Sequence, residues 1–280
     1  MSKKRNIAAT LGTLPMYLFT IVFVLGPLFL MLALSFFQVD GWSYKAVFTL
    51  ENYISAFSGT YLQTLTTSLK LALISTVFVI LLGYPFGLCT SFLSPRMQKF
   101  IMTSQMIPYW VNSLLRLYGW IIIFRANGLL DKILMGLRIT DEPLKLLYTY
   151  PAVVVGMIYV LIPFMFASVY QVAGRLDYSL IEAARDLGAS RTKAFLSVTL
   201  PLTLPGLKTG IVHTFIPSMG LFFIADILGG NKIVLTGSLI NDLLTKAHNQ
   251  PLAAALATIL MALTGAICIL LLRKPEHERQ

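Results

Sequence analysis

Long apolar runs, separated by short polar segments, make up most of this sequence. A helix that crosses a lipid bilayer needs about 20 consecutive, mostly apolar residues. Six runs are long enough, and they predict spanning helices over residues 14–37, 68–93, 100–124, 149–173, 203–226 and 251–272. The pattern therefore predicts an all-α integral membrane protein with six transmembrane helices.

The first apolar run follows Lys3, Lys4 and Arg5, and a basic start before an apolar run is also a feature of secretory signal peptides. This run is too long for a signal peptide, and it lacks a convincing small-residue cleavage site. We therefore predict that it is retained as the first span.

The composition agrees with a membrane protein. Of the 280 residues, 56% are hydrophobic and 12% are charged, whereas charged residues make up about 25% of an ordinary soluble domain. So small a charged fraction gives too little polar surface for a soluble globule, and the chain is expected to lie in a bilayer.

The placement of lysine and arginine predicts the orientation, because loops on the cytoplasmic side carry an excess of both. With the N-terminus inside, most basic residues outside the spans fall in cytoplasmic segments, namely Lys3, Lys4, Arg5, Arg96, Lys99, Arg175, Arg185, Arg191, Lys193, Arg273, Lys274 and Arg279. Both termini and the loop 174–202 are thus predicted to be cytoplasmic. The same residues account for most of the net charge of +10, and they form no single basic face, so no nucleic-acid partner is predicted.

The runs also predict three parts of the chain. A tail, the first span and an outer segment occupy 1–67, a core with the cytoplasmic loop 174–202 occupies 68–272, and a cytoplasmic tail occupies 273–280. Trp42, Tyr44 and Tyr53 in the outer segment suit the lipid headgroup region, although docking of an external binding protein is an alternative role for that segment. Two further outer segments predict short surface helices, over 129–137 and 234–246.

Polar side chains interrupt the third apolar run at helical spacing. Steps of three or four residues predict one helical stripe, formed by Gln105, Tyr109, Asn112, Ser113, Arg116 and Trp120. Pro108 removes a backbone donor within this run and predicts a bend there. An arginine that faces lipid at mid-bilayer costs about 2.5 to 3.5 kcal/mol on insertion scales, so the stripe is expected to face protein or a water-filled path. Each residue of the stripe has two alternative roles, which are a polar contact between packed spans and a contact with a transported solute.

The fifth run contains Pro217 and Gly220, which mark a weak point in its helix, and Asp226 near its outer end. Asp226 and Arg116 are expected at much the same depth, because both spans run outward from the inside. The sequence therefore predicts that these two charges pair across spans three and five.

The polar loop between the fourth and fifth runs predicts two short helices. Asp177 or Ser179 suits the start of the first, with Ser179 and Glu182 spaced as a capping box. Gly188 suits a left-handed residue that ends it. A second helix should then begin after Ser190 and run to about residue 200, before a proline stops it.

The spacing within this loop resembles the EAA motif, EAA-x3-G-x9-I-x-L-P, of permease subunits in bacterial ATP-binding-cassette (ABC) importers, with Val198 in place of isoleucine. The alternative is an ordinary amphipathic surface helix. The resemblance implies that the loop docks on a separate ATPase subunit, and we name it the coupling loop, 174–202. The implied coupling positions are Glu182, Ala183, Ala184, Gly188, Leu200 and Pro201.

Three longer strings, PYWVNSLLRLYGW, EAARDLGASRTKAF and PSMGLFFIADILGG, make nearly the whole chain similar to the B-type permease subunits of spermidine/putrescine importers. This resemblance implies the type I ABC importer permease fold in the bacterial cytoplasmic (inner) membrane. It also implies a heterodimer with a second, homologous permease, an ATPase dimer that carries the ATP and Mg, an extracytoplasmic substrate-binding protein, and polyamine import by alternating access.

A flexible polycation is bound by carboxylates and by the faces of aromatic rings. Arg116 would repel it unless the charge is neutralised, so Arg116 either pairs or marks a path for a different solute. The expected pathway residues are Tyr109, Trp110, Asn112, Ser113, Arg116, Tyr118, Phe222, Phe223 and Asp226.

The sequence predicts no enzyme activity in this chain. No Walker A pattern occurs, so ATP would be hydrolysed on another chain, and no residue spacing predicts a metal site or another cofactor. A secondary transporter or channel that needs no ATPase is the competing class, because it would also carry polar residues within its spans. A membrane-bound enzyme is disfavoured, since the acids and histidines form no catalytic constellation.

Overall fold

The computed structural model describes residues 13–41 and 43–272, so Trp42 and the predicted tails at both ends of the chain lie outside the described residues. The chain forms two compact units. Unit 1 comprises Met1–Gln63 and Leu239–Leu263, and unit 2 comprises Thr64–Ser238 and Thr264–Gln280.

Most of the described chain is helical, and five of the six apolar runs form helices long and apolar enough to cross a membrane. Within residues 13–41 and 43–272 these helices are Thr13–Leu34, Gly59–Ser91, Tyr150–Ala173, Arg191–Gly220 and Gln250–Leu272. The second begins nine residues before the predicted start at residue 68. Its end at Ser91 and the short turn before the next helix agree with the sequence pattern.

The third apolar run is not one uninterrupted helix, and the interruption lies at Pro108, where the sequence predicts a bend. It forms α5 (Pro95–Met106), a 3-10 turn (Ile107–Trp110) and α6 (Ser113–Phe124). Pro108 removes a backbone donor at the break. The Asn112 side-chain oxygen then accepts the N–H of Leu114 at 2.8 Å, which starts a new helix. The predicted stripe is therefore not the face of a single helix.

The fifth run also contains a break, here in agreement with the sequence. Helix α11 (Leu200–Gly220) ends at Leu221, whose φ of −80° and ψ of 51° are not helical, and α12 (Phe222–Gly229) follows. The chain then turns at Gly230, which has a left-handed φ of 60°. The short helix expected over 234–246 is present as α13 (Thr236–Thr245).

Unit 1 contains a small antiparallel sheet, which corrects the all-α prediction. Strand β1 (Phe37–Asp40) pairs with β2 (Ser43–Phe48), and the left-handed φ of 56° at Gly41 lets the chain reverse. The Asn52 side chain, on α3 (Glu51–Ala56), donates to the carbonyl oxygens of Ser35 and Phe37 at 3.0 and 2.9 Å. This unit also contains α2 (Gly26–Leu34), after a π-helical turn (Thr20–Leu25), most of α13, and the first part of α14 (Gln250–Leu272).

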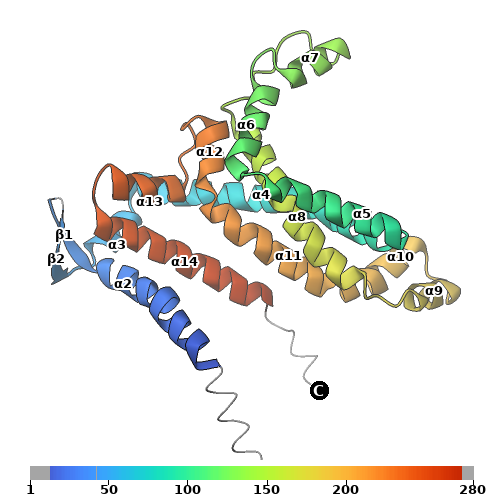
Figure 1. Cartoon of the computed structure of the whole chain (residues 1–280), viewed down its shortest axis with the longest axis horizontal. Coiled ribbons are helices and arrows are strands. Elements are labelled where there is room, and N and C mark those ends of the chain that lie inside the picture. The colour runs from blue at the N-terminus through green and yellow to red at the C-terminus, as the bar shows by residue number, and fades with distance from the viewer. Residues whose placement is uncertain (1–12, 42, 273–280) are drawn as a thin grey trace, which may run out of the picture. The chain divides into compact units, whose positions relative to one another are not determined.

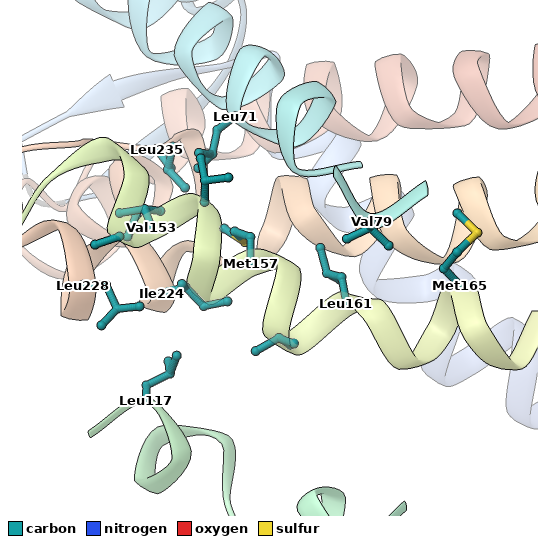
Figure 2. Packing of buried hydrophobic residues seen from close by; sticks show 14 of the residues in the cluster. Leu71, Val79, Leu117, Val153, Met157, Leu161, Met165, Ile224, Leu228 and Leu235 are labelled. Atoms are coloured by element: carbon teal, nitrogen blue, oxygen red, sulfur yellow. The ribbon is translucent and has the colours of Figure 1, made fainter. Parts of the chain in front are cut away.

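Helix α8 (Tyr150–Ala173) forms the centre of unit 2. Figure 2 shows apolar side chains of α4 (Gly59–Ser91), α6 and α12 around those of α8. The labelled buried residues of this core are Leu71, Val79, Leu117, Val153, Met157, Leu161, Met165, Ile224, Leu228 and Leu235.

Two glycines allow helices to approach α8 closely on either side. A Cβ atom at Gly87 of α4 would lie 2.9 Å from the carbonyl oxygen of Phe166, and one at Gly206 of α11 would lie 2.9 Å from that of Ser168. Backbone atoms cannot move aside cheaply, so neither position accepts a side chain without a shift of a helix. Small residues at helix contacts are the usual basis of close packing within membranes.

The segment between α6 and α8 contains the short helix that the sequence predicts over 129–137, present as α7 (Leu129–Gly136). The buried carboxylate of Asp131 accepts the backbone N–H groups of Asn127 and Leu144 at 2.9 and 3.1 Å. These two bonds hold the segment in a closed loop, at the opposite end of unit 2 from α9 (Ser179–Asp186) and α10 (Arg191–Ala194) (Figure 1).

Candidate functional site

The first helix of the coupling loop is α9 (Ser179–Asp186), which has no buried residue. Tyr178 occupies the cap position, so the predicted capping box between Ser179 and Glu182 is not formed. Neither Asp177 nor Ser179 is therefore the cap residue, but Asp177, one residue before the cap, accepts the N–H of Ser179 at 3.0 Å. Hydrogen bonds from the Ser179 hydroxyl and backbone N–H hold the pKa of Asp177 below its ordinary value, because they favour the ionised carboxylate.

Gly188 ends this helix in the left-handed conformation, as the sequence predicts, with a φ of 86°. Its N–H donates to the carbonyl oxygen of Arg185 at 2.9 Å, and the N–H of Ala189 donates to that of Ala184 at 3.0 Å. This pair of bonds is the Schellman motif, in which a left-handed residue satisfies the last carbonyls of a helix. The carbonyl of Ala184, within the EAA-like string, is therefore held by the turn.

The second helix begins as predicted but does not stop at Pro201. The Ser190 hydroxyl accepts the N–H of Lys193 at 3.2 Å at the start of α10 (Arg191–Ala194). A π-helical turn (Phe195–Thr199) then joins α10 directly to α11. Pro201 lies in the first turn of α11, where a missing N–H costs little, so the helix continues.

The coupling positions divide between two places in the loop. Glu182, Arg185, Asp186, Gly188, Ala189 and Ser190 line a shallow, polar hollow of about 510 Å³, and Ala183 is exposed beside it. Leu200 and Pro201 lie beyond the π-helical turn, within the long helix. Leu187, which the sequence places on the apolar face of the helix, is 90% exposed beside Gly188.

Arg116 does not pair with Asp226, so this prediction was wrong. Among residues 13–41 and 43–272 the ion pairs are Lys45–Asp40 and Lys246–Asp242. Asp226 accepts a hydrogen bond from the Ser238 hydroxyl at 2.7 Å, because the start of α13 supplies that donor. The two charges thus have separate environments.

The guanidinium of Arg116 lies against two aromatic rings. Its central carbon is 5.1 Å from the ring centre of Tyr109 and 5.7 Å from that of Tyr159 on α8. Both distances are within the range of cation–π attraction. Its Nε atom is buried without a hydrogen-bond partner in the described part of the chain. The sequence did not predict Tyr159 as a residue of the site, since a tyrosine in an apolar span gives no indication of its partner.

A cavity of about 370 Å³ lies beside Arg116, between α5, the 3-10 turn and α8. Its polar lining comes from Ser104, Gln105, Tyr109, Arg116 and Tyr159, and the rest of the wall is apolar. Gln105 Oε1 is also buried without a partner among the described residues. Two of the lining residues, Gln105 and Arg116, thus each carry a buried polar atom that has no hydrogen bond within the described residues.

The structure brings only some of the expected pathway residues together. Tyr109 and Arg116 share the cavity, whereas Phe222 and Phe223 pack against the apolar core from α12, which also carries Asp226. Trp110 and Tyr118 are 82% and 56% exposed. Asn112 and Ser113 form the start of α6.

Comparison with known proteins identifies related sequences along most of the chain. The family model described as "Binding-protein-dependent transport system inner membrane component" matches residues 79–274. The spermidine/putrescine transport system permease protein PotB of Haemophilus influenzae is 39% identical over 247 residues, which cover 87% of this chain and 86% of that protein. PotB of Escherichia coli K12 is 36% identical over 250 residues, covering 89% of this chain and 91% of that protein.

A solved structure shows the same fold at low sequence identity. A chain in the crystal structure of a bacterial alginate ABC transporter, in complex with an alginate pentasaccharide-bound periplasmic protein, superposes with a TM-score of 0.77. The match covers 96% of this chain and 93% of that chain at 15% identity.

Proposed function

Because this chain belongs to the family of binding-protein-dependent transport system inner membrane components, and is thus a multi-pass permease subunit of an ABC importer in the inner membrane, we propose that it carries a polyamine into the cytoplasm. The observation that carries the substrate proposal is the identity of 36% to 39% with two permeases named for spermidine and putrescine, along most of each chain. The chain itself would alternate between outward-open and inward-open states and catalyse no reaction.

The membrane topology that fits this function has six crossings with both termini in the cytoplasm. Five are the long apolar helices. The third would be the broken segment from α5 to α6, which spans residues 95–124 and contains the 3-10 turn. The excess of lysine and arginine in the segments assigned to the inside supports this orientation.

The driving force would come from an ATPase dimer, which binds ATP and Mg and docks on the coupling loops. Here the contact would involve Glu182, Ala183, Ala184 and Gly188, with Leu200 and Pro201 shaping the helix behind them. A Schellman turn beside a helix with no buried residue is a preformed surface, so binding would cost little ordering of the loop. A second, homologous permease would complete the pathway, and an extracytoplasmic binding protein would deliver the solute.

The solute would pass residues that suit a cation, namely Tyr109, Trp110, Asn112, Ser113, Tyr118, Phe222, Phe223 and Asp226. Asp226 supplies the charge, and its Ser238 partner holds the carboxylate without neutralising it. Arg116 is the exception among the expected pathway residues, because no acidic group in the described chain pairs with it.

Arg116 therefore favours a second candidate, which is import of an anionic or neutral solute by the same machinery. Arg116 and Gln105 line a cavity of about 370 Å³, and each has a polar atom without a hydrogen bond in the described chain. Such groups could bind a carboxylate or a sugar hydroxyl of a solute, or they could simply form part of the pathway wall. The resemblance to the polyamine permeases covers far more of the chain, so the polyamine is preferred.

Reconstituted vesicles that contain the full complex and its binding protein distinguish the two candidates. Labelled spermidine should accumulate when ATP is added. The variant Asp226→Asn should slow uptake, because the amide oxygen still accepts from Ser238 while the charge is lost. Lys208→Gln, which removes a charge near the inner end of α11, should matter less. Stimulation of ATP hydrolysis by an anionic or neutral solute, with none by any polyamine, would refute the polyamine and leave the permease function standing.

A further inference from the structure

The start of the coupling loop is fixed to the end of α4 by a tyrosine. Tyr178, immediately before α9, donates its hydroxyl to the carbonyl oxygen of Ser91 at 2.9 Å. Its ring centre lies 5.0 Å from that of Phe92. Ser91 is the last residue of α4, so a shift of α9 would act on the turn between α4 and α5.

Gln98, in the first turns of α5, connects the same turn to α8. Its side-chain NH₂ donates to the carbonyl oxygens of Ser91 and Leu93 at 3.1 and 2.8 Å. Its side-chain oxygen accepts the Tyr170 hydroxyl, in the last turn of α8, at 2.8 Å. A primary amide has two donors and one acceptor oxygen, and here all three groups are used. The carbonyl oxygen of Ser91 accepts hydrogen bonds from both Gln98 and Tyr178, so this one group joins α5 to the coupling loop.

The far end of the coupling loop is tied to α4 as well. The hydroxyls of Tyr84 and Thr203 lie 2.8 Å apart, and the Tyr84 ring lies 6.5 Å from that of Phe195 in the π-helical turn. Tyr84 precedes Ser91 by seven residues, or about two helical turns. Both ends of the loop are thus anchored to the last turns of α4.

Helix α5 runs from this anchor to the Arg116 cavity. Gln98 bonds Tyr170 near one end of α5, and Tyr109, in the 3-10 turn beyond its other end, donates to the carbonyl oxygen of Val160 at 3.2 Å. The two bonds hold α5 antiparallel to α8, and Figure 1 shows these helices side by side. The chain then becomes extended at Val111, with a ψ of 136°, which is where a helix can change direction.

We propose that Gln98 is a positioning residue of the transport cycle, which passes movement of the coupling loop through α5 to the broken segment beside Arg116. The inference rests on the proposed docking of the ATPase on this loop. In this arrangement the amide of Gln98 keeps the α4–α5 turn, the end of α8 and the start of α9 in register. Loss of its bonds would leave the ATPase attached and active but would separate hydrolysis from solute movement.

The test uses the complete complex in vesicles, with labelled spermidine and its binding protein, and the variants Gln98→Leu, Tyr178→Phe and their combination. Leucine retains most of the side-chain volume without the amide, and phenylalanine removes a single hydroxyl. Tyr148→Phe is the matched control, because the Tyr148 hydroxyl has no hydrogen bond within the described residues. Three quantities are measured, which are the ATPase retained on the purified complex, basal ATP hydrolysis, and spermidine taken up per ATP hydrolysed.

Uptake per ATP should fall about three- to tenfold in each single variant, with retained ATPase and basal hydrolysis within twofold of wild type. The double variant should be no worse than Gln98→Leu alone, because residues that act through one carbonyl are not additive. A loss that merely follows the amount of assembled complex, unchanged uptake per ATP, or multiplied losses in the double variant would each overturn the proposal. Failure of the wild-type permease to retain any ATPase would instead refute the proposed docking.

Discussion

A side chain at Gly188 should weaken attachment of the ATPase to the coupling loop. The residue has a φ of 86°, and a Cβ atom added there would meet no heavy atom within 4 Å. A Cβ atom at residue 188 would therefore not clash with its neighbours, and the effect of an alanine there comes from the strain of the backbone conformation alone. The free-energy cost of the substitution therefore equals the cost of the left-handed conformation.

The left-handed conformation costs an L-residue with a Cβ atom about 1 to 2 kcal/mol. The loop could relax this strain by giving up the bonds from Gly188 to Arg185 and from Ala189 to Ala184, each worth about 0.5 to 1.5 kcal/mol. Keeping the strained conformation and giving up the two hydrogen bonds thus cost similar amounts of free energy. If that conformation binds the ATPase and the strained free loop relaxes to another one, a cost of about 1 to 2 kcal/mol raises the apparent Kd by at most about 5- to 30-fold.

Titration of the purified ATPase onto the permease complex in nanodiscs measures this Kd. Gly188→Ala should give the weakening estimated from strain, and Gly188→Val should give more, because β-branched residues adopt positive φ least readily. Gly188→Asn should give less, since asparagine tolerates the left-handed region. Gly136→Ala is the matched control, because its Cβ also meets nothing within 4 Å and its φ is not positive.

Equal affinity of the wild-type and Gly188→Val complexes, with equal transport, would refute the assignment of this turn to the ATPase contact. Weakening by Gly136→Ala to the same degree would show that the assay responds to any change in the permease. A reversed order, with asparagine worse than valine, would show that side-chain contacts and not backbone strain decide the affinity.

Two further predictions follow from the geometry of unit 2. Gly206→Ala should lower the thermal unfolding midpoint of the detergent-solubilised protein, by overpacking worth about 1 to 3 kcal/mol against the Ser168 carbonyl, whereas Gly119→Ala, which meets no atom within 4 Å, should not lower it. Ser179→Ala should raise the pKa of Asp177 toward 3.8 in an NMR titration. Because the pKa of Asp177 is lower in the folded than in the unfolded protein, its stabilisation is present above the unfolded pKa and is lost as the pH falls through the folded pKa. Binding of the ATPase should therefore not respond to Asp177 between pH 6 and 8.

Features set by a few neighbouring residues could be predicted from the sequence. Gly188 and Ser190 end one helix and start the next as expected, because left-handed φ and hydroxyl capping depend on local backbone geometry. Five of the six apolar runs form long helices within the described residues, as predicted, since a run of about 20 apolar residues has few alternatives in a bilayer.

The partners of buried charges could not be predicted in this way. Depth along two spans suggested that Arg116 and Asp226 pair, but depth does not give the direction in which a side chain points. The break at Asn112 sets the rotation of α6 independently of α5, and Arg116 lies against Tyr109 and Tyr159. Ser238, a small hydroxyl residue in a short helix, then satisfies Asp226 and gives no distinctive pattern in the sequence.

The prolines show why helix ends were harder to predict than helix existence. Pro27 and Pro201 each follow a π-helical turn, closed by the N–H of Gly26 on Ile21 and by that of Leu200 on Phe195. In both helices the wider turn places the proline among the first residues of the next α-helical segment, where no donor is needed, so the helix continues. For the coupling loop this continuity has a mechanical consequence, because the residues after Ser190 belong to the same helix as the membrane-spanning part of α11. The same helix contains the π-helical turn and two internal prolines, Pro205 and Pro217, which are the usual places where a helix bends, so force applied by a docked ATPase would reach the break at Leu221 through a continuous helix that can bend at these points.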